Sequence, residues 1–230
     1  MAATFTDSKR YERVSSRKFM LWLGIVSIIM LFAGLTSAYI IREGEGRWVD
    51  FKLPSLFMVS TAMIVLASVT LHWAVVSVKK NNLSSMNMAL VLAAVFGLGF
   101  VLFQYQASKQ LVEGGIYFSG QVKYINMDYQ YISADTTNPR VKKLLKENSE
   151  LRFENPADVQ NVAGSFLYAI AGLHVVHVLG GIIALSVVLW RAGRKKYSAA
   201  NYEGISLCAT YWHFLDGLWI YLYLFLIFIR

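Results

Sequence analysis

Hydrophobic residues are gathered along the chain into five long stretches, with polar segments between them. The stretches contain no lysine, arginine or glutamate, and they cover residues 19–41, 54–78, 86–108, 162–190 and 206–229. A helix needs about 20 apolar residues to cross the roughly 30 Å hydrocarbon core of a bilayer, and every stretch is long enough. The pattern therefore predicts an all-α integral membrane protein, with five transmembrane helices bundled into one membrane domain over residues 1–230.

The longest polar segment, residues 109–161, separates the third predicted helix from the fourth. Asn138 and Pro139 are typical of a helix start, and the apolar residues that follow recur at helical spacing: Val141, Leu144, Leu145 and Leu151. We expect a short surface helix there, and the aromatic residues of the loop argue against disorder. Pro54 is expected in the first turn of the second helix, where a missing N–H is tolerated.

Basic residues are concentrated in the segments that would lie on the same side of the membrane as the N-terminus. These segments carry Lys9, Arg10, Arg13, Arg17, Lys18, Lys79, Lys80, Arg191, Arg194, Lys195 and Lys196. Only Asp7, Glu12 and Glu203 oppose them. The positive-inside rule then predicts a cytoplasmic N-terminus, an outside C-terminus and an extracytoplasmic 109–161 loop. Anionic lipid headgroups account for the net charge of +8, so no nucleic-acid partner is expected.

Composition agrees with a membrane protein and gives no sign of soluble-enzyme chemistry. Hydrophobic residues make up 56% of the chain and charged residues 16%, which is far from the usual balance of a soluble domain. The single cysteine, Cys208, excludes an internal disulfide and any CxxC motif, and we expect it to serve packing. No phosphate loop, nucleophile elbow or dinucleotide fingerprint occurs, so the chain itself is predicted to be non-catalytic.

Small residues in the third and fourth stretches are expected to let helices approach closely. They are Gly97, Gly99, Gly172, Gly180, Gly181 and Ala184. Helices in lipid associate through such close contacts and through polar groups. These positions therefore predict a packed bundle and do not by themselves indicate a function.

Four ionisable side chains in the last two stretches are the candidate site. His174 and His177 are three residues apart, as are His213 and Asp216, so each pair shares a helix face. Counting about 1.5 Å per residue from the cytoplasmic ends puts His177 and Asp216 at similar depth. Because such groups are costly in a bilayer unless they find partners, we expect an intramembrane polar cluster that hydrogen-bonds the two helices together. It would be structural, with no catalytic, cofactor or metal role, and Asp216→Ala would lower stability by about 1–3 kcal/mol.

Two other interpretations of these histidines remain open at this point. Haem b could be ligated by His177 with His213, or by His72 with His213, which would make the chain a membrane anchor of another respiratory complex. Alternatively, Asp216 and the histidines could relay protons or carry ions. The chain shows no inverted repeat of the kind that many carriers have.

Two segments carry a resemblance to a known family. Residues 211–219 read YWHFLDGLW and closely resemble the YWHFVDVVW signature of subunit III of haem-copper oxidases. Residues 171–181 read AGLHVVHVLGG and are similar to the family's TGxHGLHVxxG, with both histidines in register. The family-motif positions in these segments are Tyr211, Trp212, Phe214, Trp219, Gly172 and Gly181. Weaker similarity covers the other stretches, so the chain is similar to the short, five-helix bacterial members.

The resemblance implies a non-catalytic subunit III of a bacterial cytochrome c or quinol oxidase, in the cytoplasmic (inner) membrane. Such a subunit packs beside the catalytic subunit I and near subunit II, binds phospholipid, and supports oxygen reduction coupled to proton pumping. Haem and copper are expected in the partner subunits, with no cofactor in this chain. Ile28 stands where many relatives carry an intramembrane carboxylate, which argues against proton uptake through that site. The long 109–161 loop is expected to dock further respiratory subunits.

Overall fold

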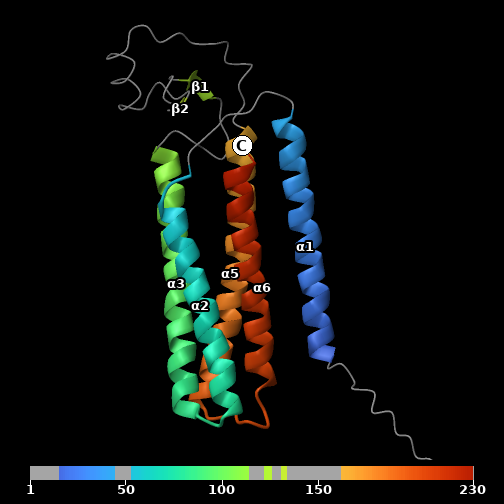
Figure 1. Ribbon diagram of the computed structural model, residues 1–230, viewed down its shortest axis with the longest axis vertical. Coiled ribbons are helices and arrows are strands. Elements are labelled where there is room, and N and C mark those ends of the chain that lie inside the picture. Colours follow the sequence, from blue (N-terminus) through green and yellow to red (C-terminus); the bar gives the residue numbers. More distant parts are fainter. Residues whose placement is uncertain (1–15, 45–52, 114–121, 126–130, 134–161, 230) are drawn as a thin grey trace, which may run out of the picture.

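The computed structural model describes residues 16–44, 53–113, 122–125, 131–133 and 162–229 (Figure 1). These ranges contain five helices: α1 (Ser16–Glu43), α2 (Leu56–Lys79), α3 (Leu83–Glu113), α5 (Val162–Gly193) and α6 (Glu203–Phe228). All five are long and apolar enough to cross a membrane, which confirms the prediction of five long apolar helices. Between α3 and α5, the strands β1 (Val122–Ile125) and β2 (Tyr131–Ser133) form an antiparallel pair that the sequence did not predict. The expected short helix after Asn138 lies outside the described residues.

The helices extend beyond most of the predicted spans, and the start of α2 differs from the prediction. Polar residues continue α1, α3, α5 and α6 past the apolar stretches, because helical hydrogen bonding does not stop where hydrophobicity does. Pro54 was expected in the first turn of α2, and this is wrong: the helix begins at Leu56 with Ser55 as its N-cap. The carbonyl of Pro54 instead accepts the Phe57 N–H at 3.1 Å, as part of the turn that leads into the helix.

The helices run alternately up and down, so that α1 starts at one end of the bundle and α6 finishes at the other (Figure 1). α2 packs against α3 and α6, α5 packs against α3 and α6, and α1 packs against α5 and α6. α6 also reaches α3 through its side chains, since the ring of Trp219 contacts that of Phe100. The start of α1 and the α2–α3 and α5–α6 connections all lie at the same end (Figure 1).

The largest side chains buried in the interior of the bundle are aromatic. The largest fully buried ones are Trp212, Trp219, Tyr39, Phe32, Phe57 and Phe100. Large apolar side chains also cover the outside, for example Met30 at 71% exposure and Ile183 at 67%. An apolar exterior of this extent suits helices whose solvent is lipid. Cys208 is free and buried, in keeping with a packing role.

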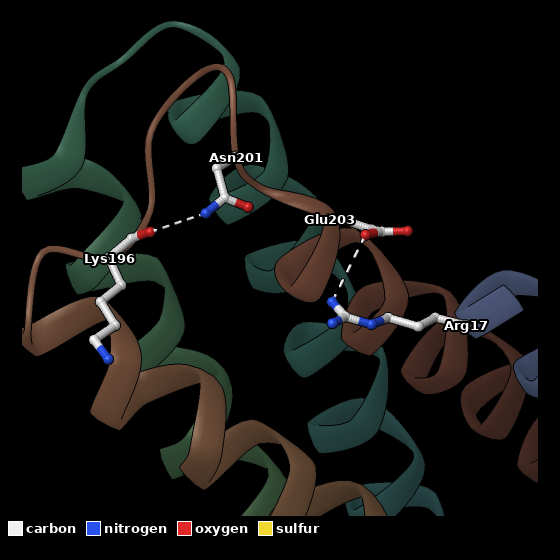
Figure 2. Close-up of polar contacts among 4 residues, drawn as sticks. All are labelled: Arg17, Lys196, Asn201 and Glu203. Atoms are coloured by element: carbon white, nitrogen blue, oxygen red, sulfur yellow. Dashed lines mark hydrogen bonds and ion pairs between the residues drawn. The ribbon is translucent and has the colours of Figure 1, made fainter. Parts of the chain in front are cut away.

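One ion pair joins the first turns of α1 and α6, beside the α5–α6 connection (Figure 2). Arg17 Nη1 lies 3.8 Å from Glu203 Oε2, and the two side chains are 74% and 36% exposed. In the connection itself, the Asn201 amide donates to the Lys196 carbonyl at 3.3 Å. Ion pairs as exposed as this one contribute little, because water and salt screen the charges.

Breaking this ion pair is expected to have a small effect. A double-mutant cycle with Arg17→Ala and Glu203→Gln should give a coupling free energy of about 1 kcal/mol or less. Unfolding in mixed detergent micelles at low and high salt would measure it. A coupling well above that limit, unchanged by salt, would show that the pair is more shielded than its exposure indicates.

Candidate functional site

Trp212 of α6 is held between glycines of two other helices. Its indole is fully buried, and Nε1–H donates to the Gly181 carbonyl of α5 at 3.1 Å. A Cβ added at Gly181 would lie 3.2 Å from the ring, and one added at Gly97 of α3 would lie 2.8 Å from its Cη2 atom. A side chain at Gly97 would therefore overlap the ring, and one at Gly181 would crowd it. The family-motif residues Trp212 and Gly181 are thus direct partners, with Gly97 as the third member.

His174 of α5 lies at the centre of the bundle among aromatic rings. Its ring centroid is 5.0 Å from that of Trp219, 5.9 Å from that of Phe100 and 6.4 Å from that of Phe32. The imidazole is fully buried, and neither ring nitrogen has a hydrogen-bond partner among the described residues. His174 therefore touches side chains of α1, α3 and α6 at once.

Trp219, the other tryptophan of the motif, connects α6 to α2. Its Nε1–H donates to the Thr61 hydroxyl at 3.0 Å, and its ring stacks on Phe57 with centroids 6.1 Å apart. Both partners come from α2, and the ring also contacts His174 of α5 and Phe100 of α3. Neither Thr61 nor Phe57 was predicted from the sequence to belong to the site. The only signal for Thr61 was a hydroxyl residue inside an apolar stretch.

His177 is half-buried and is turned toward α1. Its Nδ1–H donates to the Leu173 carbonyl of its own helix at 2.7 Å, and its ring lies 5.9 Å from that of Phe32. The Tyr211 hydroxyl of α6 donates to the backbone carbonyl of His177 at 3.1 Å. The contact between α5 and α6 at this level is therefore made by a tyrosine and a main-chain oxygen, not by the imidazole.

His213 lies toward α2 and away from the histidines of α5. Its Nδ1 is hydrogen-bonded to the Ser68 hydroxyl of α2, and its ring centroid is 6.2 Å from that of His72. His72 and His213 are both exposed on the outside of the described bundle. The structure therefore separates His213 from His174 and His177 and pairs it with two residues of α2.

Asp216 is 4% exposed, and its carboxyl group has no hydrogen bond in the described part of the chain. The Ser68 hydroxyl of α2 lies near this carboxyl group. The expected hydrogen bonds between imidazole and carboxylate are therefore absent among these residues. Side-chain donors of Tyr211 and Trp212 to α5 carbonyls join the two helices instead.

Asp216→Ala is expected to change stability less than the sequence suggested, because the carboxyl group has no hydrogen bond among the described residues. A buried polar group without a partner costs about 1–3 kcal/mol, and alanine removes that cost while leaving a small cavity of similar cost. We now expect the free energy of unfolding of the purified chain to change by less than about 1 kcal/mol. A loss of stability well beyond this, in mixed-micelle unfolding, would mean that Asp216 has a partner in the folded chain.

The remaining motif positions have lesser roles within this chain. Phe214 is half-buried against the core, and Gly172 is exposed, with nothing within 4 Å of a Cβ placed there. Ile28 also packs at the edge of the core. These positions are available to contacts that the chain alone does not make.

The positions of the histidines can be tested against haem ligation. His177 and His213 face different neighbours, Phe32 and Ser68 respectively. His72 and His213 do face each other, but a haem between them would have to lie between α2 and α6, and these two helices are in direct contact. Neither pair fits a haem. The described residues also include no group of three or more His, Cys, Asp or Glu side chains placed to hold a metal ion.

Comparison with known proteins gives the same family as the two motifs. The family model described as cytochrome c oxidase subunit III matches residues 150–229, which include both motifs and the residues around Trp212. Cytochrome c oxidase subunit 3 of Thermostichus vulcanus is 23% identical over 222 residues, covering 93% of this chain and 87% of the relative. These matches and the two motifs support membership of the cytochrome c oxidase subunit III family. The probable cytochrome c oxidase subunit 3 of Mycobacterium leprae is 26% identical over 92% of this chain and 86% of its own length.

Within the subunit III family, relatives differ in how much of their length this chain matches. Cytochrome c oxidase subunit 3 of Aedes aegypti is 27% identical over 76% of this chain but only 49% of its own length. This chain is a multi-pass membrane protein that matches the two bacterial relatives nearly end to end. Membership of the subunit III family implies association with other oxidase subunits.

Proposed function

We propose that this chain is the non-catalytic subunit III of a bacterial haem-copper terminal oxidase. The observation that carries the proposal is that side chains of the two family motifs pack inside the bundle. Trp212, Trp219 and His174 fill the interior and bring α6 together with α2, α3 and α5. The motif side chains with the closest contacts thus hold helices together, as expected of a subunit whose role is to support a neighbour.

In this role the chain packs beside the catalytic subunit I and near subunit II, which hold the haem and copper. It stabilises the catalytic subunit and so supports oxygen reduction coupled to proton pumping, but it performs no chemistry of its own. The polar residues His174, His177, His213 and Asp216 then serve the structure of the subunit and of its contacts. Gly181 and the motif tryptophans hold the bundle in the shape that the partner recognises.

The orientation that we propose has a cytoplasmic N-terminus, an outside C-terminus and a location in the cytoplasmic membrane. Basic residues support it, because the start of α1, the α2–α3 connection and the α5–α6 connection gather at one end of the bundle (Figure 1). Arg17 lies in the first turn of α1 and Lys79 ends α2, while the connections carry Lys80, Arg194, Lys195 and Lys196. Under the positive-inside rule this end is cytoplasmic, and the 109–161 segment projects outside, where further respiratory subunits can dock.

A groove at the same end supports the proposal that the subunit binds phospholipid. Its volume is about 560 Å³, and it lies between α1, α5 and α6. Arg17 and Arg191 supply positive charge, while Leu21, Val187 and Val188 supply an apolar wall. An anionic headgroup beside acyl chains fits this combination of charge and apolar surface.

Deletion of the chain from its host tests the role directly. The proposal predicts that membranes without it keep the haem spectrum of the terminal oxidase but lose oxidase activity faster during turnover. Wild-type protein supplied from a plasmid should restore the activity. Loss of the haem spectrum while the other oxidase subunits remain would instead indicate that this chain holds a haem.

A further inference from the structure

We propose that the outer face around Ser68, His72 and His213 is where a transmembrane helix of another oxidase subunit docks. We call it the imidazole face. The docked helix would place a hydrogen-bonding side chain against the two histidine rings. The inference rests on the proposed function and adds to it the surface of contact and the chemistry of the partner helix.

The first argument is the exposure of two imidazoles inside membrane spans. His72 lies seven residues before Lys79 at the end of α2, and His213 lies ten residues after Glu203 at the start of α6. At about 1.5 Å per residue these positions are roughly 10 and 15 Å along the helices, too far for a short imidazole to reach the headgroups. Both are nevertheless exposed. Polar groups at such depth normally face protein or water, so lipid is a poor neighbour for this face.

The second argument is unused hydrogen-bonding capacity. Ser68 bonds to Nδ1 of His213, which leaves Nε2 directed away from that contact. Within the described residues, no hydrogen bond is made by Nε2 of His213 or by either nitrogen of His72. His174 is different, because aromatic rings enclose it inside the bundle. The imidazole face therefore offers donors and acceptors outward, where only a second membrane-embedded polar group can use them.

The third argument is the space that Gly217 leaves beside His213. Gly217 lies one turn beyond His213 and is exposed, and a Cβ placed there would have no atom of the described chain within 4 Å. The family signature quoted above has valine at this position, so this chain has an open notch beside the histidine. Val65 and Val69 continue the face along α2, and α2 and α6 lie in direct contact (Figure 1). A small residue next to a polar group lets a neighbouring helix approach closely enough to hydrogen-bond.

Photo-crosslinking in the intact complex tests the proposal. A photoreactive amino acid is placed at Val69, which is 60% exposed, and as a control at Val95 of α3, which is 58% exposed. The two positions are at comparable depth, ten residues from Lys79 and twelve from Leu83. We expect Val69 to crosslink to another oxidase subunit and Val95 to give lipid adducts. Adducts at Val69 only to lipid or to a second copy of this chain, or equal adducts from both positions to the same subunit, would overturn the proposal.

A second variant examines His72, which makes no hydrogen bond within the described residues. Replacing it by leucine, His72→Leu, would be harmless or favourable if the face met lipid. If it meets a partner helix, recovery of the other subunits after a stringent detergent wash should fall about tenfold. Unchanged recovery would contradict the proposal. Co-purification of the wild-type chain in the same experiment separates the two ideas, since its failure would refute the proposed function and not the choice of face alone.

Discussion

Trp212→Ala is expected to destabilise the bundle by about 3–5 kcal/mol, the usual cost of emptying a buried tryptophan site. The indole is fully buried, and its N–H donates to the Gly181 carbonyl, so alanine loses both the packing and the hydrogen bond. The cavity would lie where α3, α5 and α6 meet. Unfolding of the purified chain in mixed detergent micelles, followed by circular dichroism, measures the change.

Trp22→Ala is the matched control for this variant. Trp22 is 58% exposed on α1, so its loss should change the free energy of unfolding by less than about 0.5 kcal/mol. Trp212→Phe separates the two contributions, because it keeps most of the ring and loses the hydrogen bond, worth about 0.5–1.5 kcal/mol. Equal effects of the alanine variants at Trp212 and Trp22 would contradict the packing described for Trp212.

Gly97→Ala is expected to destabilise the chain by about 1–3 kcal/mol, although alanine is the better helix former. The new Cβ would lie 2.8 Å from Cη2 of Trp212, which is closer than carbon atoms approach. The indole cannot retreat, because Gly181 lies against it and its N–H is bonded there. Thermal unfolding of the purified chain, monitored by size-exclusion fluorescence, should show a lower midpoint.

Gly99→Ala provides the control on the same helix. A Cβ at Gly99 meets only the Met63 Sδ atom, at an ordinary 3.8 Å. This variant should be neutral or slightly stabilising. The double variant Gly97→Ala with Trp212→Ala should recover much of the loss caused by Gly97→Ala, because the clash has gone. Additive effects of the two changes would mean that Gly97 and Trp212 are not in contact.

Hydropathy alone predicted the five helices, because a bilayer requires long apolar segments whose backbone groups are satisfied within the helix. The ends of the helices were predicted less accurately, because polar residues extend a helix beyond its apolar stretch. The start of α2 shows this most clearly, with Pro54 outside the helix. The β1 and β2 strands had no clear signal in the sequence. The only element predicted in that loop was the short helix after Asn138.

The sequence singled out four polar residues as one cluster, but the structure does not bring them together. Residues three apart on a helix differ by about 60° in direction, and on α6 the edge of the buried face falls between His213 and Asp216. One is therefore exposed and the other buried. Gly97 and Trp212 were both singled out from the sequence, yet their contact depends on how α3 and α6 are placed against each other. Sequence spacing within one helix carries no information on that placement.

The central claim is that this chain is a colourless accessory subunit of a haem-copper oxidase. The most direct measurement is to purify the tagged chain gently from its native membrane and to identify the chains that accompany it. A reduced-minus-oxidised spectrum is then recorded before and after the chain is stripped from them. The account predicts that a large haem-copper subunit co-purifies and that the stripped chain shows no haem band. A haem b band retained by the stripped chain, or the absence of any oxidase subunit from the intact preparation, would contradict it.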